Sequence, residues 1–435
     1  MIERALKEQI FSNKEIDYSW SFADKTQKDT SYITHNYYTY PAKFIPQLAA
    51  RLIEEYSNPL DIVVDPFMGS GTTMVESLVK NRLCVGVDIN DIAYLVSKVK
   101  TTPLNLDILY KEYENIKNIL SFSSSLFGVD KDELLGKAKK IIPNNEKIDY
   151  WFKEKQKHEL SVILYLIFQI NDKDIQNFFL VAFAQILKSC SIWLQKSVKP
   201  TRDKDKKEAQ CFVLFLNQVK KMIQKHRQYH SMLSEEVLKN PQKYINIFCN
   251  DSRLLPLQSE QASLIVTSPP YVTSYEYADL HQLPSLWFGF FDTLSEFRKK
   301  FIGSSSKERN NIDLKSDLAQ NIVSNLKNKK AKEVKNYYAD MLETFIEMKR
   351  VLKKGAKACI VIGNTQFKEV DILNAEVFVE QMQNIGFKIC DIIHREIPSK
   401  MLPSTRDSKT GRFAKINTTN KLAYPTEYIL IMEKI

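Results

Sequence analysis

An apolar run at residues 263–266 ends in Thr267-Ser-Pro-Pro-Tyr271. The run is typical of a short buried β-strand, and the two prolines end the strand and fix the backbone after it. The Ser268 hydroxyl and the Pro269 carbonyl can accept hydrogen bonds from an –NH₂ group, while the tyrosine ring stacks on the planar ring that carries this group. A rigid strand exit with a surface tyrosine would use the same residues, so this stretch alone leaves both interpretations open.

A second stretch, Asp65-Pro-Phe-Met-Gly-Ser-Gly-Thr-Thr73, joins an apolar run to a helical pattern. Its glycines let the backbone approach a ligand closely. Ligands of doubly wound sheets lie beyond the carboxyl ends of the strands, which is where this loop falls. The stretch matches neither the phosphate-binding P-loop nor the dinucleotide fingerprint. We therefore expect a ligand-binding turn of another kind.

Acidic residues end the strands on either side of this loop in the chain. Asp88 ends the run that follows the loop, a position from which a carboxylate can bind both hydroxyls of a ribose. Asp251 ends a third run and is placed to accept a hydrogen bond from the exocyclic amine of adenine, as is Asn250, which could instead cap a turn. A strand-end aspartate is also a common helix cap. Together with the glycine loop, these residues predict a pocket for an adenosine with a charged tail other than phosphate.

The elements that must position these residues alternate in type. Strand patterns at 61–65 and 83–88 alternate with helical patterns at 72–80 and 91–100, which predicts a parallel, doubly wound sheet. Further strand patterns lie at 244–250, 263–267, 357–363, 387–393 and 428–433.

Three regions do not follow this alternation. Residues 102–244 have only helical patterns and basic runs, so we expect a helical domain inserted into a sheet domain formed by 35–101 and 245–435. Residues 1–34 are expected to form a loosely attached N-terminal arm. Residues 301–335 are polar, charged and poor in apolar anchors, which predicts a mobile loop.

Composition limits the class of protein. The chain has 435 residues and a formal net charge of +10, which favours a polyanionic partner. Its six cysteines show no zinc-site spacing, and we expect no metal site. The longest apolar run, 162–170, is too short to cross a bilayer, and the N-terminus lacks the apolar core of a signal peptide. We expect a soluble cytoplasmic protein.

The two motifs together resemble those of the S-adenosylmethionine-dependent DNA amino-methyltransferases. The Ser-Pro-Pro-Tyr stretch is most similar to the N4-cytosine branch, because the N6-adenine enzymes usually have Asp or Asn before the prolines. The glycine motif here precedes the catalytic motif, whereas many Ser-Pro-Pro-Tyr enzymes have the opposite order. The resemblance covers roughly residues 35–100 and 245–435, and it implies a Rossmann-like class I methyltransferase fold with a doubly wound, mostly parallel seven-stranded sheet.

The resemblance also implies a set of site residues. The catalytic residues are Ser268, Pro269, Pro270 and Tyr271. The residues that bind the cofactor S-adenosyl-L-methionine are Lys43, Phe44, Asp65, Pro66, Phe67, Gly69, Ser70, Gly71, Thr72, Asp88, Asn90 and Asp251.

The implied reaction agrees with the residue types present. An aromatic amine is a weak nucleophile, and hydrogen bonds to Ser268 and the Pro269 carbonyl favour a pyramidal nitrogen with an available lone pair. Water can take the proton that is released, so no tuned base is needed, and we expect His281 to be a helix-surface residue. A C5-cytosine enzyme would need a cysteine nucleophile, usually after a proline, and the sequence has no Pro-Cys.

The implied partner is DNA. A base within a duplex cannot reach this stretch, so we expect a flipped base with Tyr271 replacing the lost stacking. Candidate DNA contacts are the basic residues Arg406, Lys409, Arg412, Lys196, Lys199 and Arg202. We expect a site-specific enzyme of a restriction-modification or defence system. A cognate restriction endonuclease is then an expected partner. The alternatives are an N6-adenine DNA methyltransferase and a catalytically inactive, cofactor-binding DNA-recognition subunit.

Overall fold

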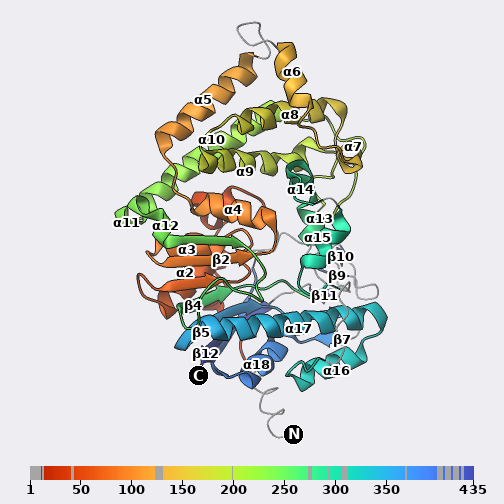
Figure 1. Ribbon diagram of the computed structural model, residues 1–435. Helices are drawn as coiled ribbons and strands as arrows, with labels where there is room; N and C mark the ends of the chain where they lie inside the picture. Colours follow the sequence, from red (N-terminus) through yellow and green to blue (C-terminus); the bar gives the residue numbers. More distant parts are fainter. Residues whose placement is uncertain are drawn as a thin grey trace.

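Seven strands form one sheet in the order β3-β2-β1-β4-β5-β12-β8 (Figure 1). The computed structural model describes residues 11, 14–40, 44–122, 131–197, 199–272, 277–291, 293–304, 312–367, 370–398, 405–406, 413–414, 421–422 and 426–435. The strands of this sheet are β1 (Ile62–Asp65), β2 (Leu83–Asp88), β3 (Ile245–Cys249), β4 (Ala262–Thr267), β5 (Leu352–Ile362), β8 (Phe387–Glu396) and β12 (Thr426–Lys434).

The sheet is mostly parallel. The neighbours β3, β2, β1, β4 and β5 pair in parallel, whereas β12 runs antiparallel between β5 and β8. The chain reverses its direction of winding at β1, so the carboxyl ends of β1 and β4 lie side by side at the switch point where doubly wound sheets bind ligands. The predicted Rossmann-like, mostly parallel seven-stranded sheet is confirmed.

Helices cover both faces of the sheet, because successive residues of a strand point to opposite faces. On one face, Leu264 of β4 belongs to an apolar layer with α2 (Pro46–Tyr56). On the other face, Ile265 packs in a layer with α17 (Asn328–Val351) and α18 (Asn374–Asn384). Two further helices, α3 (Thr72–Val79) and α4 (Asp91–Thr101), follow β1 and β2.

The chain between α4 and β3 is helical, and we call residues 106–232 the helical block. Figure 1 shows this block stacked over α4. Its apolar core is continuous with the buried face of α4, where Ile92, Val96 and Val99 belong to the same cluster as the helices of the block. Its helices are α5 (Leu106–Phe122), α6 (Lys131–Lys139), α7 (Glu146–Trp151), α8 (Glu154–Phe168), α9 (Lys173–Cys190) and α10 (Cys211–Met232), and α11 (Glu235–Lys239) and α12 (Pro241–Tyr244) lead to β3.

Across the described ranges, every helix is too short or too polar to span a lipid bilayer.

The N-terminal segment is docked on the sheet, at residues 14–34, and not loosely attached as we expected. Trp20 is buried, and the Arg395 guanidinium of β8 donates hydrogen bonds to the carbonyl oxygens of Trp20 at 2.8 Å and Ser21 at 3.3 Å. Arg395 is itself buried and forms an ion pair with Glu427 of β12. The sequence did not reveal this docking, because the Arg395 contacts are made to backbone carbonyls, which have no residue signature.

The predicted mobile loop at 301–335 is wrong for much of its length. It contains α16 (Asp317–Asn325) and the start of α17. Ser316 caps α16 by accepting a hydrogen bond from the Ala319 N–H at 2.9 Å, and it donates one to Glu380 of α18 at 2.6 Å. Ala319 and Ile322, three residues apart, supply the buried face of α16. Two small apolar anchors were enough to dock a short helix that the polar composition concealed.

We predict that Arg395→Ala lowers the free energy of unfolding by about 3–5 kcal/mol, because it leaves the buried Glu427 carboxylate without its cationic partner. Lys14→Ala is the matched control. Lys14 joins the same segment to Asp391 of β8 at 3.0 Å, but both side chains are exposed, and its loss should cost under about 1 kcal/mol. Urea denaturation of both variants measures the two values. Equal losses would contradict a docking role for Arg395.

Candidate active site

A cavity of about 380 Å³ lies at the carboxyl ends of β1, β2, β3 and β4, a size typical of small-molecule sites. The predicted site residues that line it are Phe44, Asp65, Pro66, Phe67, Gly69, Ser70, Thr72, Asp88, Asp251, Ser268, Pro270 and Tyr271. Pro269, Gly71 and Asn90 do not line it, and Lys43 lies outside the described residues. The fold thus brings residues from both predicted motifs into one cavity.

The glycine loop between β1 and α3 is shaped by local backbone requirements. Gly69 and Gly71 have φ values of +48° and +72°, which favour glycine. A Cβ atom on Gly71 would lie 2.8 Å from the Ser97 hydroxyl of α4, so the loop can approach α4 only with glycine at this position. Gly71 therefore shapes the loop from behind, whereas Gly69 faces the cavity.

Helix α4 fixes the loop in place. The Ser97 hydroxyl donates a hydrogen bond to the Gly69 carbonyl at 2.8 Å, and the buried Lys100 ammonium donates one to the Ser70 carbonyl. Sequence reasoning missed both residues, because they lie within a helical pattern and belong to no motif. Their spacing of three residues on one helix face is the signal that was available.

Two carboxylates hold the loop from the strand ends. Asp88 accepts hydrogen bonds from the backbone N–H groups of Gly69 and Asn90, each at 2.9 Å, and Asn90 in turn caps α4. Asp65 accepts hydrogen bonds from the Phe67 N–H at 3.0 Å and from the Thr267 hydroxyl at 2.7 Å. Burial disfavours the charged form and raises the pKa of Asp65 and of Asp88 to about 6.

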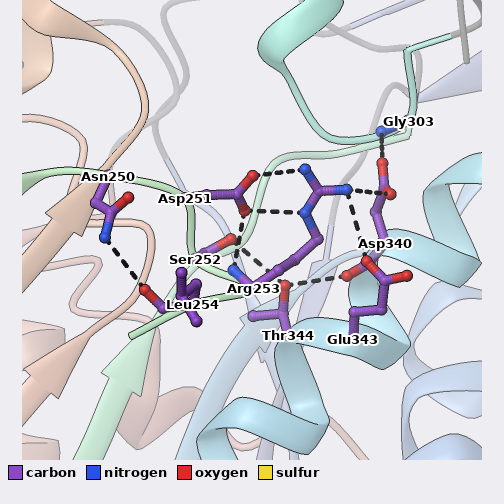
Figure 2. A network of polar contacts seen from close by, with 9 residues as sticks. All are labelled: Asn250, Asp251, Ser252, Arg253, Leu254, Gly303, Asp340, Glu343 and Thr344. Atoms are coloured by element: carbon purple, nitrogen blue, oxygen red, sulfur yellow. Dashed lines mark hydrogen bonds and ion pairs between the residues drawn. The ribbon is translucent and has the colours of Figure 1, made fainter. Parts of the chain in front are cut away.

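Asp251 is held by a cation that sequence reasoning missed. Figure 2 shows the Arg253 guanidinium between Asp251 and Asp340, with donor–acceptor distances of 2.9 and 2.5 Å to the two Asp251 oxygens and 2.7 Å to Asp340. Hydrogen bonding to Asp251 raises the pKa of Arg253. The guanidinium thus orients the Asp251 carboxylate at the cavity wall, whereas the Asn250 amide donates to the Leu254 carbonyl at 3.3 Å and caps a turn.

The same network reaches a second wall of the cavity. The Asp340 carboxylate of α17 is fully buried and also accepts a hydrogen bond from the Gly303 N–H at 2.9 Å (Figure 2). Residues 301–304 line the cavity. Arg253 therefore ties the loop after β3 to α17 and to this lining segment.

The Ser-Pro-Pro-Tyr stretch leaves β4 at the cavity wall. The Tyr337 hydroxyl of α17 donates a hydrogen bond to the Pro270 carbonyl at 2.8 Å, so α17 fixes the backbone between the second proline and Tyr271. Tyr337 is buried in the apolar layer below the sheet. No local pattern marks it, because its role follows from the packing of α17 alone.

Contacts from the far strands orient the Tyr271 ring. Its hydroxyl donates a hydrogen bond to Glu427 of β12 at 3.3 Å, and Glu427 is the carboxylate that pairs with Arg395. A Cβ atom on Gly363 would lie 3.3 Å from the ring, so the chain after β5 approaches the ring closely. Glu427 thus holds the tyrosine hydroxyl and the chain at Gly363 packs against the ring, so Tyr271 is not a free surface residue.

His281 is buried, contrary to our prediction of a helix-surface residue. Its Nδ1 lies 3.1 Å from the Tyr38 hydroxyl, and its ring packs on Tyr40 with centroids 4.6 Å apart. Burial lowers its pKa to about 3, so the ring is neutral at ordinary pH. The error arises because the segment at 37–40, distant in sequence, covers this position.

The predicted DNA contacts that the structure describes do not line the cavity. Lys196, Lys199 and Arg202 are exposed on the connection after α9, and the Arg202 guanidinium lies 4.1 Å from the centroid of the Tyr150 ring. Arg406 belongs to the short strand β9 (Thr405–Arg406), which pairs with β10 (Phe413–Ala414) and β11 (Lys421–Leu422). Lys409 and Arg412 lie outside the described residues.

Comparison with known proteins agrees with this geometry. Over 413 residues the chain is 25% identical to the Type II methyltransferase M.MvaI of Kocuria varians, a match that covers 90% of each protein. It is 23% identical to the Type II methyltransferase M.MjaII of Methanocaldococcus jannaschii, across 82% of this chain and 77% of that protein. The crystal structure of TrmN from Thermus thermophilus aligns with 90% of this chain and with 49% of the TrmN chain. The TM-score is 0.29 and the identity 9%, values too low to support any inference.

The family model N6_N4_Mtase, described as DNA methylase, matches residues 3–98 and 262–435. The matched segments contain the glycine loop and the Ser-Pro-Pro-Tyr stretch, and residues 99–261 between them contain the helical block and β3. The match extends over more than half of the chain, and the chain therefore belongs to the DNA methylase family.

Proposed function

We propose that this protein transfers a methyl group from S-adenosyl-L-methionine to the exocyclic N4 amine of a flipped cytosine in DNA. The observation that carries the proposal is the shared cavity, which Ser268 and Tyr271 line together with the glycine loop and the acids at the ends of β2 and β3. A site-specific enzyme of a restriction-modification or defence system fits this reaction, and a cognate restriction endonuclease would be its partner.

The cavity fits the proposed cofactor. Gly69 lines the cavity with a φ of +48°, a conformation that favours glycine, and without a side chain its backbone can approach a bound ligand closely. Asp88 is placed to accept hydrogen bonds from ribose hydroxyls, and Asp251 to accept one from the adenine amine. With these carboxylates and no phosphate-binding motif, the donor set suits a nucleoside with a cationic tail better than a nucleotide. When bound, S-adenosylmethionine supplies an electrophilic methyl group.

The Ser-Pro-Pro-Tyr stretch prepares the acceptor amine. The Ser268 hydroxyl and the Pro269 carbonyl accept hydrogen bonds from the amine, which withdraws the nitrogen lone pair from the ring and makes it available. The Pro270 carbonyl is engaged by Tyr337 and is not needed for this task. The nitrogen would form a bond to the methyl carbon as the carbon–sulfur bond of the cofactor breaks, leaving a neutral thioether, and would then lose one proton to water. Correct positioning of both reactants provides much of the rate.

Tyr271 stacks on the flipped base and replaces part of the stacking lost from the duplex. For the remaining DNA contacts we propose the basic residues named from the sequence, and the helical block, with its exposed Lys196 and Lys199, is the candidate region for target recognition. An N6-adenine substrate is the alternative within the family, since a serine before the prolines biases the base without fixing it. The alternative of another class is an inactive DNA-recognition subunit.

The choice between these alternatives can be tested with purified protein, radiolabelled cofactor and duplex DNA. We expect label in the DNA and, after digestion to nucleosides, N4-methylcytosine. Recovery of N6-methyladenine alone would replace the base assignment. Cofactor binding and DNA binding without any label in the DNA would identify the inactive subunit.

Replacing Tyr271 with Ala should reduce methyl transfer by about tenfold to a hundredfold, because base–aromatic stacking contributes ~1–3 kcal/mol. Cofactor affinity should change little. Tyr271→Phe is the matched control, since it keeps the ring and removes only the hydrogen bond to Glu427, and it should retain most of the activity. Single-turnover kinetics and calorimetric cofactor titration separate the two effects. Equal loss of transfer and of cofactor affinity in the alanine variant would show that Tyr271 has another role.

Cofactor affinity should fall as the pH decreases from 7 to 5. The Asp88 pKa of about 6 means that its carboxylate becomes protonated in this range and loses acceptor capacity. The Asp88→Asn side chain is neutral at every pH, so the variant should bind the cofactor more weakly at pH 7. Toward pH 5, cofactor binding should release up to one proton fewer from the variant than from the wild type. Calorimetry at several pH values measures both quantities. A variant with the affinity and pH profile of the wild type would remove Asp88 from the cofactor site.

A further inference from the structure

One side of the cavity is lined by cations that the cofactor and the amine do not explain. Arg298 and Lys300 come from α15 (Leu294–Lys300), and Lys329 and Lys330 come from the first turn of α17. We call these four residues the cationic rim. Figure 1 shows α15 above the right-hand, N-terminal end of α17, on the side of the molecule away from α11 and α12.

The charges of the cavity are segregated. The acids Asp65, Asp88 and Asp251 stand at the carboxyl ends of β1 and β2 and just after β3. The cations stand on helices that follow the Ser-Pro-Pro-Tyr stretch in the chain. The cationic side also holds the Glu333 carboxylate, but its cations outnumber this single acid. A ligand that touches both groups therefore meets carboxylates at one wall and an excess of cations at the other. The acids suit a cationic cofactor, so the cations call for an anionic second ligand.

The rim keeps excess positive charge after its internal ion pairs are counted. Arg298 is paired with Asp279, with distances of 2.6 and 2.8 Å to the two carboxylate oxygens. Among the described residues, Lys329 and Lys330 share the single carboxylate of Glu333, at 3.7 and 2.8 Å. Two ammonium groups against one carboxylate leave one positive charge, to which Lys300 adds another.

The rim cations are also accessible. The side chains of Lys329 and Lys330 are 75% and 50% exposed, while that of Glu333 is 14% exposed and lies beneath them. Exposed ion pairs of this kind contribute little to stability. The lysines are therefore free to exchange a carboxylate contact for one with a stronger anion at the cavity mouth.

We propose that the cationic rim binds the phosphate backbone of the DNA strand that carries the target base. This inference rests on the proposed function, because it assumes that the base enters the cavity beside Tyr271. Phosphates on either side of a flipped nucleotide must pass close to the cavity mouth, and Lys329 and Lys330 on one helix turn are positioned to bind adjacent phosphates there. The rim thereby adds a contact region next to the reaction centre, distinct from Lys196, Lys199 and Arg202.

The test compares two double variants. Lys329→Gln with Lys330→Gln removes two rim cations. Lys239→Gln with Lys243→Gln is the matched control, since these exposed lysines of α11 and α12 pair with Glu235 and Glu236 and do not line the cavity. Affinity for a DNA duplex is measured by fluorescence anisotropy at several KCl concentrations. Cofactor affinity is measured by calorimetry without DNA.

We expect the rim variant to bind every DNA sequence more weakly. The slope of log affinity against log salt is negative, and its magnitude should fall by about 0.9 for each lost phosphate contact. Its cofactor affinity and its thermal unfolding should match those of the wild type. The control variant should keep the wild-type salt slope. Lys300→Gln alone should give a smaller decrease of the same sign.

Two results would overturn the inference. If the rim variant keeps the wild-type salt slope while the wild type methylates DNA, the rim does not contact phosphate and the proposed function stands. If the rim variant instead loses cofactor affinity with an unchanged salt slope, the lysines bind the carboxylate of the cofactor. Absence of methyl transfer in the wild type, in contrast, is a failure of the proposed function itself, and a reduced salt slope would then still support phosphate binding by the rim.

Discussion

The two halves of the site are joined by a buried hydrogen bond from the Thr267 hydroxyl to the Asp65 carboxylate, 202 residues apart in the chain and 2.7 Å apart in space. Asp65 also holds the backbone of the glycine loop through the Phe67 N–H. Since β1 and β4 are adjacent and parallel, this contact fixes where the Ser-Pro-Pro-Tyr stretch leaves the sheet relative to the loop. The shared carboxylate thus holds the two motifs in a fixed relation at the cavity wall.

The antiparallel end of the sheet supports the same site from a distance. Glu427 of β12 accepts the Tyr271 hydrogen bond and pairs with Arg395 of β8, which in turn holds the backbone at Trp20. A buried pair of this kind is weak evidence for stability, but the loss of one partner leaves an isolated charge. The hydroxyl contact of Tyr271 and the docking of the N-terminal segment therefore share one ion pair.

Local patterns allowed the sheet, the glycine loop and the Ser-Pro-Pro-Tyr stretch to be predicted. Glycines in a turn, paired prolines and strand-end acids can be recognised within a few residues of sequence. Contacts that depend on tertiary packing were not predictable in this way. Arg253 looked like an ordinary loop cation, Tyr337 like one of many helix residues, and His281 like a surface residue. The docked segment at 14–34 and α16 were misjudged for the same reason, since partners distant in the chain bury a few anchor residues such as Trp20 and Ile322.

The shared core of α4 and the helical block has a consequence for how such proteins diversify. The face of α4 that packs under the block and the residues Ser97 and Lys100 that hold the glycine loop belong to one rigid helix. A chimera that exchanges residues 106–232 alone would cut through this core and disturb the loop. A substitution in the block that shifts its packing on α4 therefore also acts on the glycine loop.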